Sequence, residues 1–102
     1  MLSTERKPVS VGEMLVEEFL TPMSLTQGAL AAAMGVERKL VNELRNDRRT
    51  VTADTALVLA RVFGNSPEFW LNVQRRMDLW EALHTPKRRQ RIEQAKALQA
   101  VA

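Results

Sequence analysis

The sequence predicts an all-α protein that folds as one domain. Helix-favouring residues (Ala, Leu, Glu, Arg and Gln) recur along the 102-residue chain, whereas Gly and Pro number four each and Tyr is absent. A chain of this length fits one domain, and its 45% hydrophobic residues allow a modest buried core. Apolar residues also recur at helical spacing between clear start and stop signals, which locates each helix in turn.

A polar N-terminal arm, residues 1–9, precedes the first predicted helix. That helix starts near Ser10 and ends before Pro22, and its three glutamates lie away from its apolar side. The apolar side consists of Met14, Leu15, Phe19 and Leu20. The helix is therefore amphipathic, with one side for the core and one for solvent.

Residues 26–46 predict two short helices joined by a turn at Gly35. The first runs from about Thr26 to Met34 and the second from about Arg38 to Arg45. Glycine suits the turn because the reversal of the chain often demands a positive φ. Two short helices joined in this way match the helix-turn-helix pattern. Small residues on the first helix are expected to let it lie close to its neighbour, namely Ala29, Ala32 and Ala33.

The second of these helices has one apolar and one polar side. Val41 and Leu44, with Val36 before them, are expected to anchor it to the body. The opposite arc carries Arg38, Lys39, Asn42, Glu43 and Asn46. All five can address base edges or phosphates, and the major groove admits one helix, so this face favours DNA recognition. The alternative is an αα-hairpin whose polar face is only solvated.

A further helix is predicted between Thr52 and Gly64. Thr52 is a suitable N-cap, and Asp54 lies in the first turn, where the helix dipole favours negative charge. Its expected buried stripe is Leu57, Ala60 and Phe63.

The last strongly predicted helix has Ser66 as its N-cap and Pro67 at its first position, and it ends before Pro86. Its core stripe is predicted to be Phe69, Trp70, Val73, Met77 and Trp80. Leu79 and Leu83 form an adjoining apolar strip, and a second strip usually needs a second partner. We therefore expect a homodimer that uses Leu79, Leu83 and Trp80; the alternative is that the two leucines cover the tail.

Charge is spread unevenly along the chain, whose net charge is +3. Residues 10–36 hold three acids and no base, whereas residues 37–49 hold five bases against three acids. The tail, residues 84–102, is basic, rich in alanine and expected to be helical. Two basic patches fit a polyanionic partner and a solvated surface equally well, so charge alone does not decide.

Several classes of protein are disfavoured. The absence of cysteine excludes disulfides and thiolate metal sites, and no run of apolar residues is long enough for a membrane span, so a cytoplasmic protein is expected. No phosphate loop or metal cluster is visible, and the lone His84 suits a structural or solvated role. Adjacent Glu17 and Glu18 point in different directions and cannot form a carboxylate pair. We expect no enzyme and no cofactor.

The segment LTQGALAAAMGV resembles the second helix of five-helix repressor domains of the lambda and Cro type. The resemblance implies a lambda-repressor-like fold over residues 10–83, with the motif at about 26–46. Helical phase and this match together assign base reading to Arg38, Lys39, Asn42 and Glu43. The residues assigned to phosphates are Gln27, Asn46, Arg48 and Arg49.

A narrower resemblance covers residue 8 to about residue 83. The segments VGEMLVEEFLTPM and SPEFWLNVQ, followed by DLW, are similar to those of the HigA family of antitoxins, also described as the VapI or plasmid-maintenance antidote type. Membership implies binding to a HigB-type ribonuclease toxin and repression of its own operon as an operator-bound dimer. Two positions depart from the family pattern. Val11 stands where many relatives have Pro, and Glu37 replaces the usual Ser or Thr cap of the recognition helix.

The surface for a toxin is expected on the acidic first helix, the N-terminal arm, or both. A ribonuclease toxin must be basic to hold RNA, and Glu13, Glu17 and Glu18 form the acidic cluster without nearby bases. The alternative is a solvated face. Two other functions also remain open: a stand-alone transcriptional regulator without a toxin, and a protein-binding module that has lost DNA affinity.

Overall fold

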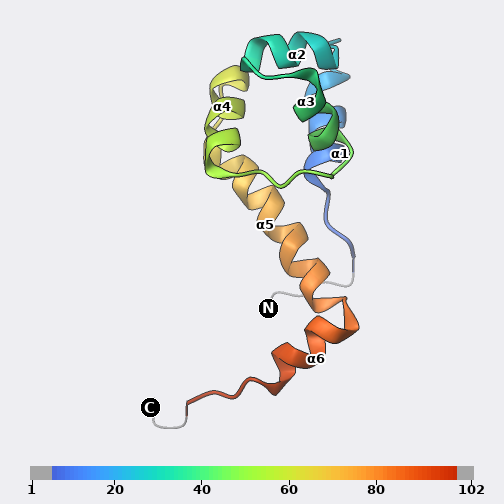
Figure 1. The fold of residues 1–102 in the computed structure, drawn as a ribbon, viewed down its shortest axis with the longest axis vertical. Helices are drawn as coiled ribbons and strands as arrows, with labels where there is room; N and C mark the ends of the chain where they lie inside the picture. Colours follow the sequence, from blue (N-terminus) through green and yellow to red (C-terminus); the bar gives the residue numbers. More distant parts are fainter. Residues whose placement is uncertain (1–5, 99–102) are drawn as a thin grey trace.

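The structure is a computed structural model that describes residues 6–98, and every regular element in this part of the chain is helical. The elements in order are α1 (Val11–Leu15), the π-helical segment η1 (Val16–Leu20), α2 (Gln27–Met34), α3 (Arg38–Arg45), α4 (Ala53–Phe63), α5 (Pro67–Leu83) and α6 (Pro86–Gln94). The predicted all-α class is confirmed. Figure 1 shows α1 to α4 gathered into one body, from which α5 runs out towards α6.

Residues that the sequence predicted to begin or end helices do so in the structure. Ser10 caps α1 in a reciprocal capping box with Glu13, and the hydroxyls of Thr52 and Ser66 accept the backbone N–H three residues on. Gly35 and Gly64 end their helices at φ values of 72° and 73°. The first helix is continuous with η1, whose wider turn is closed by a bond of 2.9 Å from Thr21 N–H to the Val16 carbonyl.

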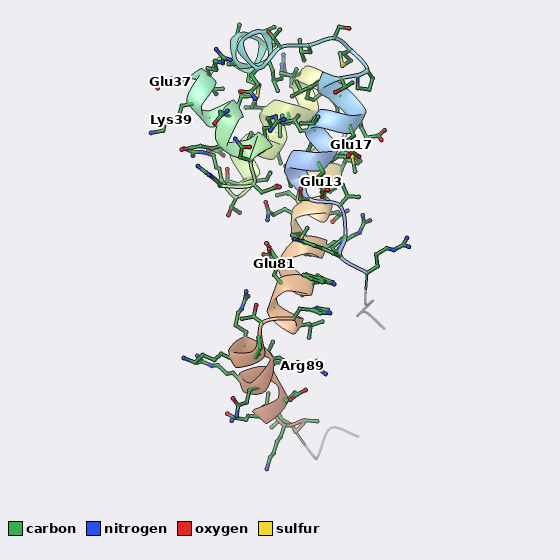
Figure 2. The ribbon with its side chains drawn as sticks, turned by 90° about the vertical axis from the view of Figure 1, so that its right-hand side faces the viewer. Glu13, Glu17, Glu37, Lys39, Glu81 and Arg89 are labelled. Carbon is green, nitrogen blue, oxygen red and sulfur yellow. The ribbon has the colours of Figure 1, made fainter. Side chains whose placement is uncertain are left out.

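The last turns of α5 and all of α6 extend beyond the body. Figure 2 shows Glu81 and Arg89 on this projecting part. Leu79 is 57% exposed, Leu83 and Trp80 are half-buried, and α6 has no buried residue. Within residues 6–98, no helix is long and apolar enough to cross a membrane. The apolar strip predicted beside the core stripe is therefore present at the surface.

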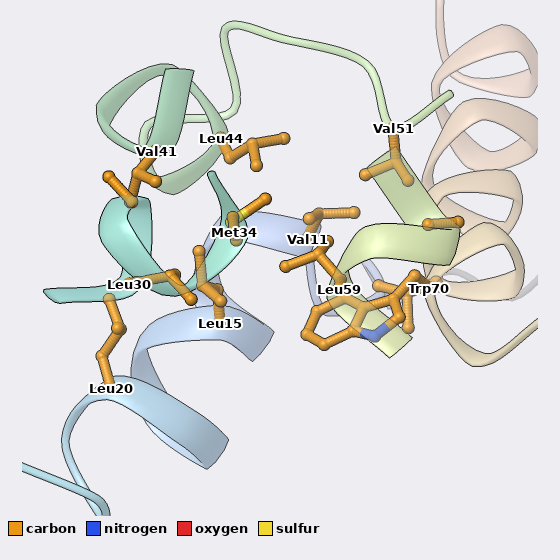
Figure 3. Packing of buried hydrophobic residues seen from close by; sticks show 13 residues of the cluster. Val11, Leu15, Leu20, Leu30, Met34, Val41, Leu44, Val51, Leu59 and Trp70 are labelled. Carbon is orange, nitrogen blue, oxygen red and sulfur yellow. The ribbon is translucent and has the colours of Figure 1, made fainter. Parts of the chain in front are cut away.

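The core joins the first five α-helices through large side chains with almost no exposed area (Figure 3). Its largest fully buried members are Trp70, Leu15, Leu30, Leu44, Leu59 and Val41. Trp70 keeps its polar atom satisfied because Nε1–H donates to the Asn65 side-chain oxygen at 3.0 Å. Phe19 packs on this indole at a centroid distance of 5.1 Å and on Phe63 at 4.4 Å.

The predicted inward side of α2 is wrong. Ala29, Ala32 and Ala33 are exposed, and the residues that face the core are Leu30, Ala31 and Met34. Small or apolar residues surround most of this helix, so its hydrophobic pattern does not define one side. The larger Leu30 and Met34 occupy the core because they remove more apolar area from water.

The predicted stripe of α4 is also partly wrong. Leu57 is 58% exposed, whereas Ala56, Leu59 and Ala60 are buried, and Phe63 is half-buried. On α5 the stripe is correct for Trp70, Val73 and Met77, while Phe69 and Trp80 are half-buried. Both helices carry apolar residues on more than one side, so packing against neighbouring helices selects the buried side.

The buried side of α4 can be tested by making the same substitution at two positions of this helix, one buried and one exposed. Leu59→Ala should lower the free energy of unfolding by about 2–5 kcal/mol, because it removes a fully buried side chain and leaves a cavity. Leu57→Ala should change it by less than about 0.5 kcal/mol. Thermal and urea unfolding monitored by circular dichroism would measure both, and equal losses would contradict the burial described here.

Candidate nucleic-acid interface

Two buried side chains fix the orientation of α3. Val41 and Leu44 have no exposed area and join the core from one side of the helix. The turn before α3 is held by a bond of 3.0 Å from Val36 N–H to the Ala31 carbonyl. Glu37 is the N-cap, and its side chain makes no capping hydrogen bond, as its residue type predicts. The helix therefore presents one defined face to solvent.

That face carries the residues predicted to address DNA. Arg38, Lys39, Asn42 and Asn46 are exposed, and Glu43 is half-buried. Figure 2 shows Glu37 and Lys39 at the edge of the body, directed outward. Within residues 6–98 no hydrogen bond or ion pair holds the side chain of Arg38 or Lys39. These two cations in the first turn can reach bases without giving up an internal partner.

Three amide side chains on the same face are linked to one another. Asn42 donates from Nδ2 to Gln27 Oε1 at 3.2 Å, which joins the start of α2 to the middle of α3. Asn46 donates from Nδ2 to the Asn42 carbonyl at 3.0 Å and to Asn42 Oδ1 at 3.3 Å. The structure thus brings Gln27 of α2 next to Asn42, which is 15 positions away in the sequence, and links Asn42 to Asn46 one turn further along α3.

Arg45 joins this network and was missed by sequence reasoning. Its Nη1 donates to Asn46 Oδ1 at 3.2 Å. Helical phase places Arg45 at the border between the apolar and polar sides of α3, so the sequence pattern gave no reason to select it. Its exposed guanidinium adds a cation to the end of α3.

Glu43 and Arg49 form an ion pair that the sequence did not predict. Arg49 Nη2 and Nε lie 2.8 Å and 2.9 Å from Glu43 Oε1. The pair is partly exposed, with side-chain exposures of 46% for Arg49 and 26% for Glu43, so it contributes at most about 1 kcal/mol to stability. Glu43 therefore orients Arg49 through Oε1, and the base-reading role predicted for Glu43 stays a prediction.

The segment after α3 completes the surface. Arg48 is exposed, and its backbone N–H donates to the Glu43 carbonyl at 2.8 Å, which keeps it next to the last turn of α3. Within residues 6–98, no cluster of three or more His, Cys, Asp or Glu residues could hold a metal ion. The side chains of this surface are mainly hydrogen-bond donors and positively charged groups, which suit contacts with phosphates and base edges.

Comparison with known proteins agrees with this geometry. A family model described as helix-turn-helix matches residues 16–70. The chain is also 56% identical over 81 residues to antitoxin HigA-1 of Vibrio cholerae, covering 79% of this chain and 76% of that protein. The chain belongs to the HigA family of antitoxins.

Two solved structures of related antitoxins contain DNA. Antitoxin GraA in complex with its operator is 37% identical and superposes with a TM-score of 0.85, covering 98% of this chain and 100% of that one. Pseudomonas aeruginosa antitoxin HigA with the higBA promoter is 33% identical, with a TM-score of 0.81 and coverage of 89% and 98%. The predicted family and the lambda-repressor-like fold class are confirmed.

The division between base reading and phosphate contact can be tested on one pair of arginines. Arg38→Ala should cost about 1–3 kcal/mol on the operator and flatten the preference at one base pair in each half-site, because its planar fork matches guanine O6 and N7. Arg48→Ala should weaken operator and scrambled duplex alike and reduce the salt slope by roughly one unit. Fluorescence anisotropy at several salt concentrations measures both variants. Equal weakening of both duplexes by Arg38→Ala would reassign it to phosphate contact.

Proposed function

We propose that this chain is the antitoxin of a toxin–antitoxin pair, which represses its own operon through α3 and neutralises a HigB-type ribonuclease toxin by direct binding. The observation that carries the proposal is the exposed hydrogen-bonding face of α3, held in place by buried Val41 and Leu44. Related antitoxins of the same fold occur in structures with an operator and with the higBA promoter, which supports DNA binding here. Both activities are binding activities in the cytoplasm, and the chain has no enzymatic role.

Two measurements test the two parts of this proposal. The protein should bind a duplex from the promoter of its own operon more tightly than a scrambled duplex of equal length. Co-expression with the toxin from the same operon should restore growth and yield a co-purifying complex. Failure of the duplex measurement would contradict the repressor part alone, and failure of co-expression would contradict the antitoxin part alone.

A stand-alone regulator is the second candidate. It is favoured by a 44% identical relative over 91 residues, an uncharacterised helix-turn-helix transcriptional regulator of Haemophilus influenzae, with coverage of 89% of this chain and 85% of that protein. A neighbouring reading frame for a small basic protein favours the antitoxin. A promoter-binding protein with no such neighbour favours the regulator.

We also propose that the chain works as a homodimer through the end of α5. Leu79, Leu83 and Trp80 present apolar area beyond the body, and α6 does not cover Leu79. A two-fold dimer would present two copies of α3 to successive major grooves about 34 Å apart, which implies a palindromic operator.

The dimer surface can be tested with two matched leucines. Leu79→Asp should convert the dimer to the 11.6 kDa monomer, because a carboxylate would be desolvated at the interface. Leu57→Asp is the control: Leu57 is equally exposed, at 58% against 57%, but lies on α4. Sedimentation at micromolar concentration distinguishes the species. A Leu79→Asp dimer would exclude this surface.

The acidic first helix remains our proposed toxin surface. Glu17 and Glu18 are exposed, whereas Glu13 accepts the Ser10 backbone N–H at 2.9 Å and so has a structural role as well. Figure 2 shows Glu17 on the opposite side of the body from Lys39. A toxin on this surface would leave the exposed face of α3 open to DNA.

Reversal of two charges tests this surface. Glu17→Lys combined with Glu18→Lys should slow association with the toxin by about tenfold or more, because rim charges mainly steer encounter. Operator binding by the same variant should be retained, which controls for folding. Stopped-flow association rates at low and moderate salt give the measurement, and an unchanged rate would remove these residues from the toxin surface.

A further inference from the structure

One carboxylate ties the end of α3 to the start of the first helix. Asp47 Oδ2 accepts a hydrogen bond from Ser10 Oγ at 2.7 Å, and Oδ1 accepts one from the Gly12 backbone N–H at 2.8 Å. Ser10 is only 6% exposed, and its Oγ accepts the Glu13 backbone N–H at 3.1 Å. We call this arrangement of Asp47, Ser10 and Gly12 the clasp. It connects residues 35 and 37 positions apart in the sequence.

The clasp uses the otherwise unpaired end of a helix. The first N–H groups of α1 have no partner within the helix, and its dipole favours a negative charge at this end. Asp47 supplies both the acceptor and the charge from a different element. A charge-assisted hydrogen bond is stronger than a neutral one, so the two bonds form a stiff connection.

The backbone of Asp47 is in an unusual conformation. Its φ is 57°, in the left-handed region, where residues with a side chain are uncommon and where Asp, Asn and Gly are tolerated best. Glycine would make this turn with less strain. Unlike glycine, aspartate has a side chain that contacts α1 with both oxygens. The reason for aspartate at this position is therefore the contact between the two helices and not the turn itself.

Gly12 allows the two elements to approach closely. A Cβ atom at this position would overlap the Arg45 carbonyl oxygen and lie 3.0 Å from Asp47 Oδ2. Such contacts cannot be accommodated without a shift of the backbone. The start of α1 is therefore in direct contact with the last turn of α3, and the clasp and the close packing act on the same few atoms.

We propose that Asp47 is a positioning residue for operator binding. It holds the last turn of α3 against α1 and thereby places Asn46, Arg48 and Arg49, on either side of it, for phosphates of the operator. The inference rests on the proposed DNA-binding function and adds a residue that contacts no DNA. Fixing these groups before DNA arrives lowers the conformational cost of binding.

The negative charge of Asp47 and its hydrogen bonds should have opposite effects on DNA affinity, so the two effects can be measured separately. A carboxylate beside phosphate-binding cations repels DNA, so removal of its charge alone should tighten binding to any duplex. Loss of the clasp should weaken binding to the operator, because Asn46, Arg48 and Arg49 would no longer be held in register. A variant without the charge but with the clasp isolates the second effect.

Asp47→Asn and Asp47→Gly are a matched pair because they have the same charge and both tolerate a positive φ. Asparagine can keep the clasp, since its Oδ1 can accept the Gly12 N–H and its Nδ2 can donate to Ser10 Oγ. Glycine removes both bonds. We expect Asp47→Asn to bind the operator at least as tightly as the wild type. We expect Asp47→Gly to bind it on the order of tenfold more weakly, a loss comparable to that of about one hydrogen bond.

Three readouts separate positioning from a general loss of structure. Anisotropy gives affinities for operator and scrambled duplex, and both should fall by a similar factor for Asp47→Gly alone, because the groups that it misplaces are proposed to contact phosphates. The melting temperature of Asp47→Gly should stay near that of Asp47→Asn, since relief of strain offsets the lost bonds. Amide hydrogen exchange of Gly12 should be slow in the wild type and Asp47→Asn, and fast in Asp47→Gly.

The outcomes distinguish this inference from the function on which it rests. Wild-type protein that binds operator, with equal affinities for the asparagine and glycine variants, would overturn the role of Asp47 and leave the proposed function intact. Wild-type protein that does not prefer its operator would overturn the proposed function itself. A rapidly exchanging Gly12 amide in the wild type would show that the clasp is absent in solution.

Discussion

The burial of Val41 and Leu44 is the constraint on which the rest of the site depends. A helix of eight residues is marginal in water by its own hydrogen bonds, so α3 exists because tertiary packing holds it. Two fully buried side chains three residues apart leave it no rotational freedom about its axis. The direction of every polar side chain on α3 follows from that contact. The hydrophobic core therefore fixes the orientation of the face that is predicted to bind DNA.

Residues on the polar face of α3 differ in whether their side chains are already hydrogen-bonded within the protein. Arg38 and Lys39 in the first turn have no partner within the described residues, so the base contacts predicted for them would displace only water. Asn42 and Asn46 are already linked to one another, so DNA contacts in this part require an exchange of hydrogen bonds. An exchange of comparable bonds contributes little net affinity but strongly penalises a mismatched partner. The first turn can therefore form new contacts with DNA, whereas the middle of the helix would have to exchange hydrogen bonds that already exist.

The features that could be predicted from the sequence are those determined by local chemistry. Ser10, Thr52 and Ser66 start helices because their hydroxyls satisfy nearby N–H groups, and the glycines end helices because they accept positive φ. The inward sides of α2 and α4 were mispredicted because apolar residues surround both helices. The Glu43–Arg49 pair and the clasp depend on contacts between elements whose relative position no local pattern specifies.

Helix α5 links the proposed dimer surface to the DNA-binding surface. Gln74 of α5 accepts the Val51 backbone N–H through Oε1 at 3.1 Å and donates from Nε2 to Asp78 Oδ1 at 2.8 Å. Val51 is separated from Arg48 and Arg49 by Thr50 alone and is 4% exposed. The segment that carries the two arginines is therefore fixed to α5 at one end and to α1 through Asp47 at the other. A single helix then holds the segment that we propose to contact phosphates and carries the apolar strip that we propose to contact a second copy. In the proposed dimer, the separation of the two copies of α3 would then depend on α5, which packs on the body and carries the exposed Leu79.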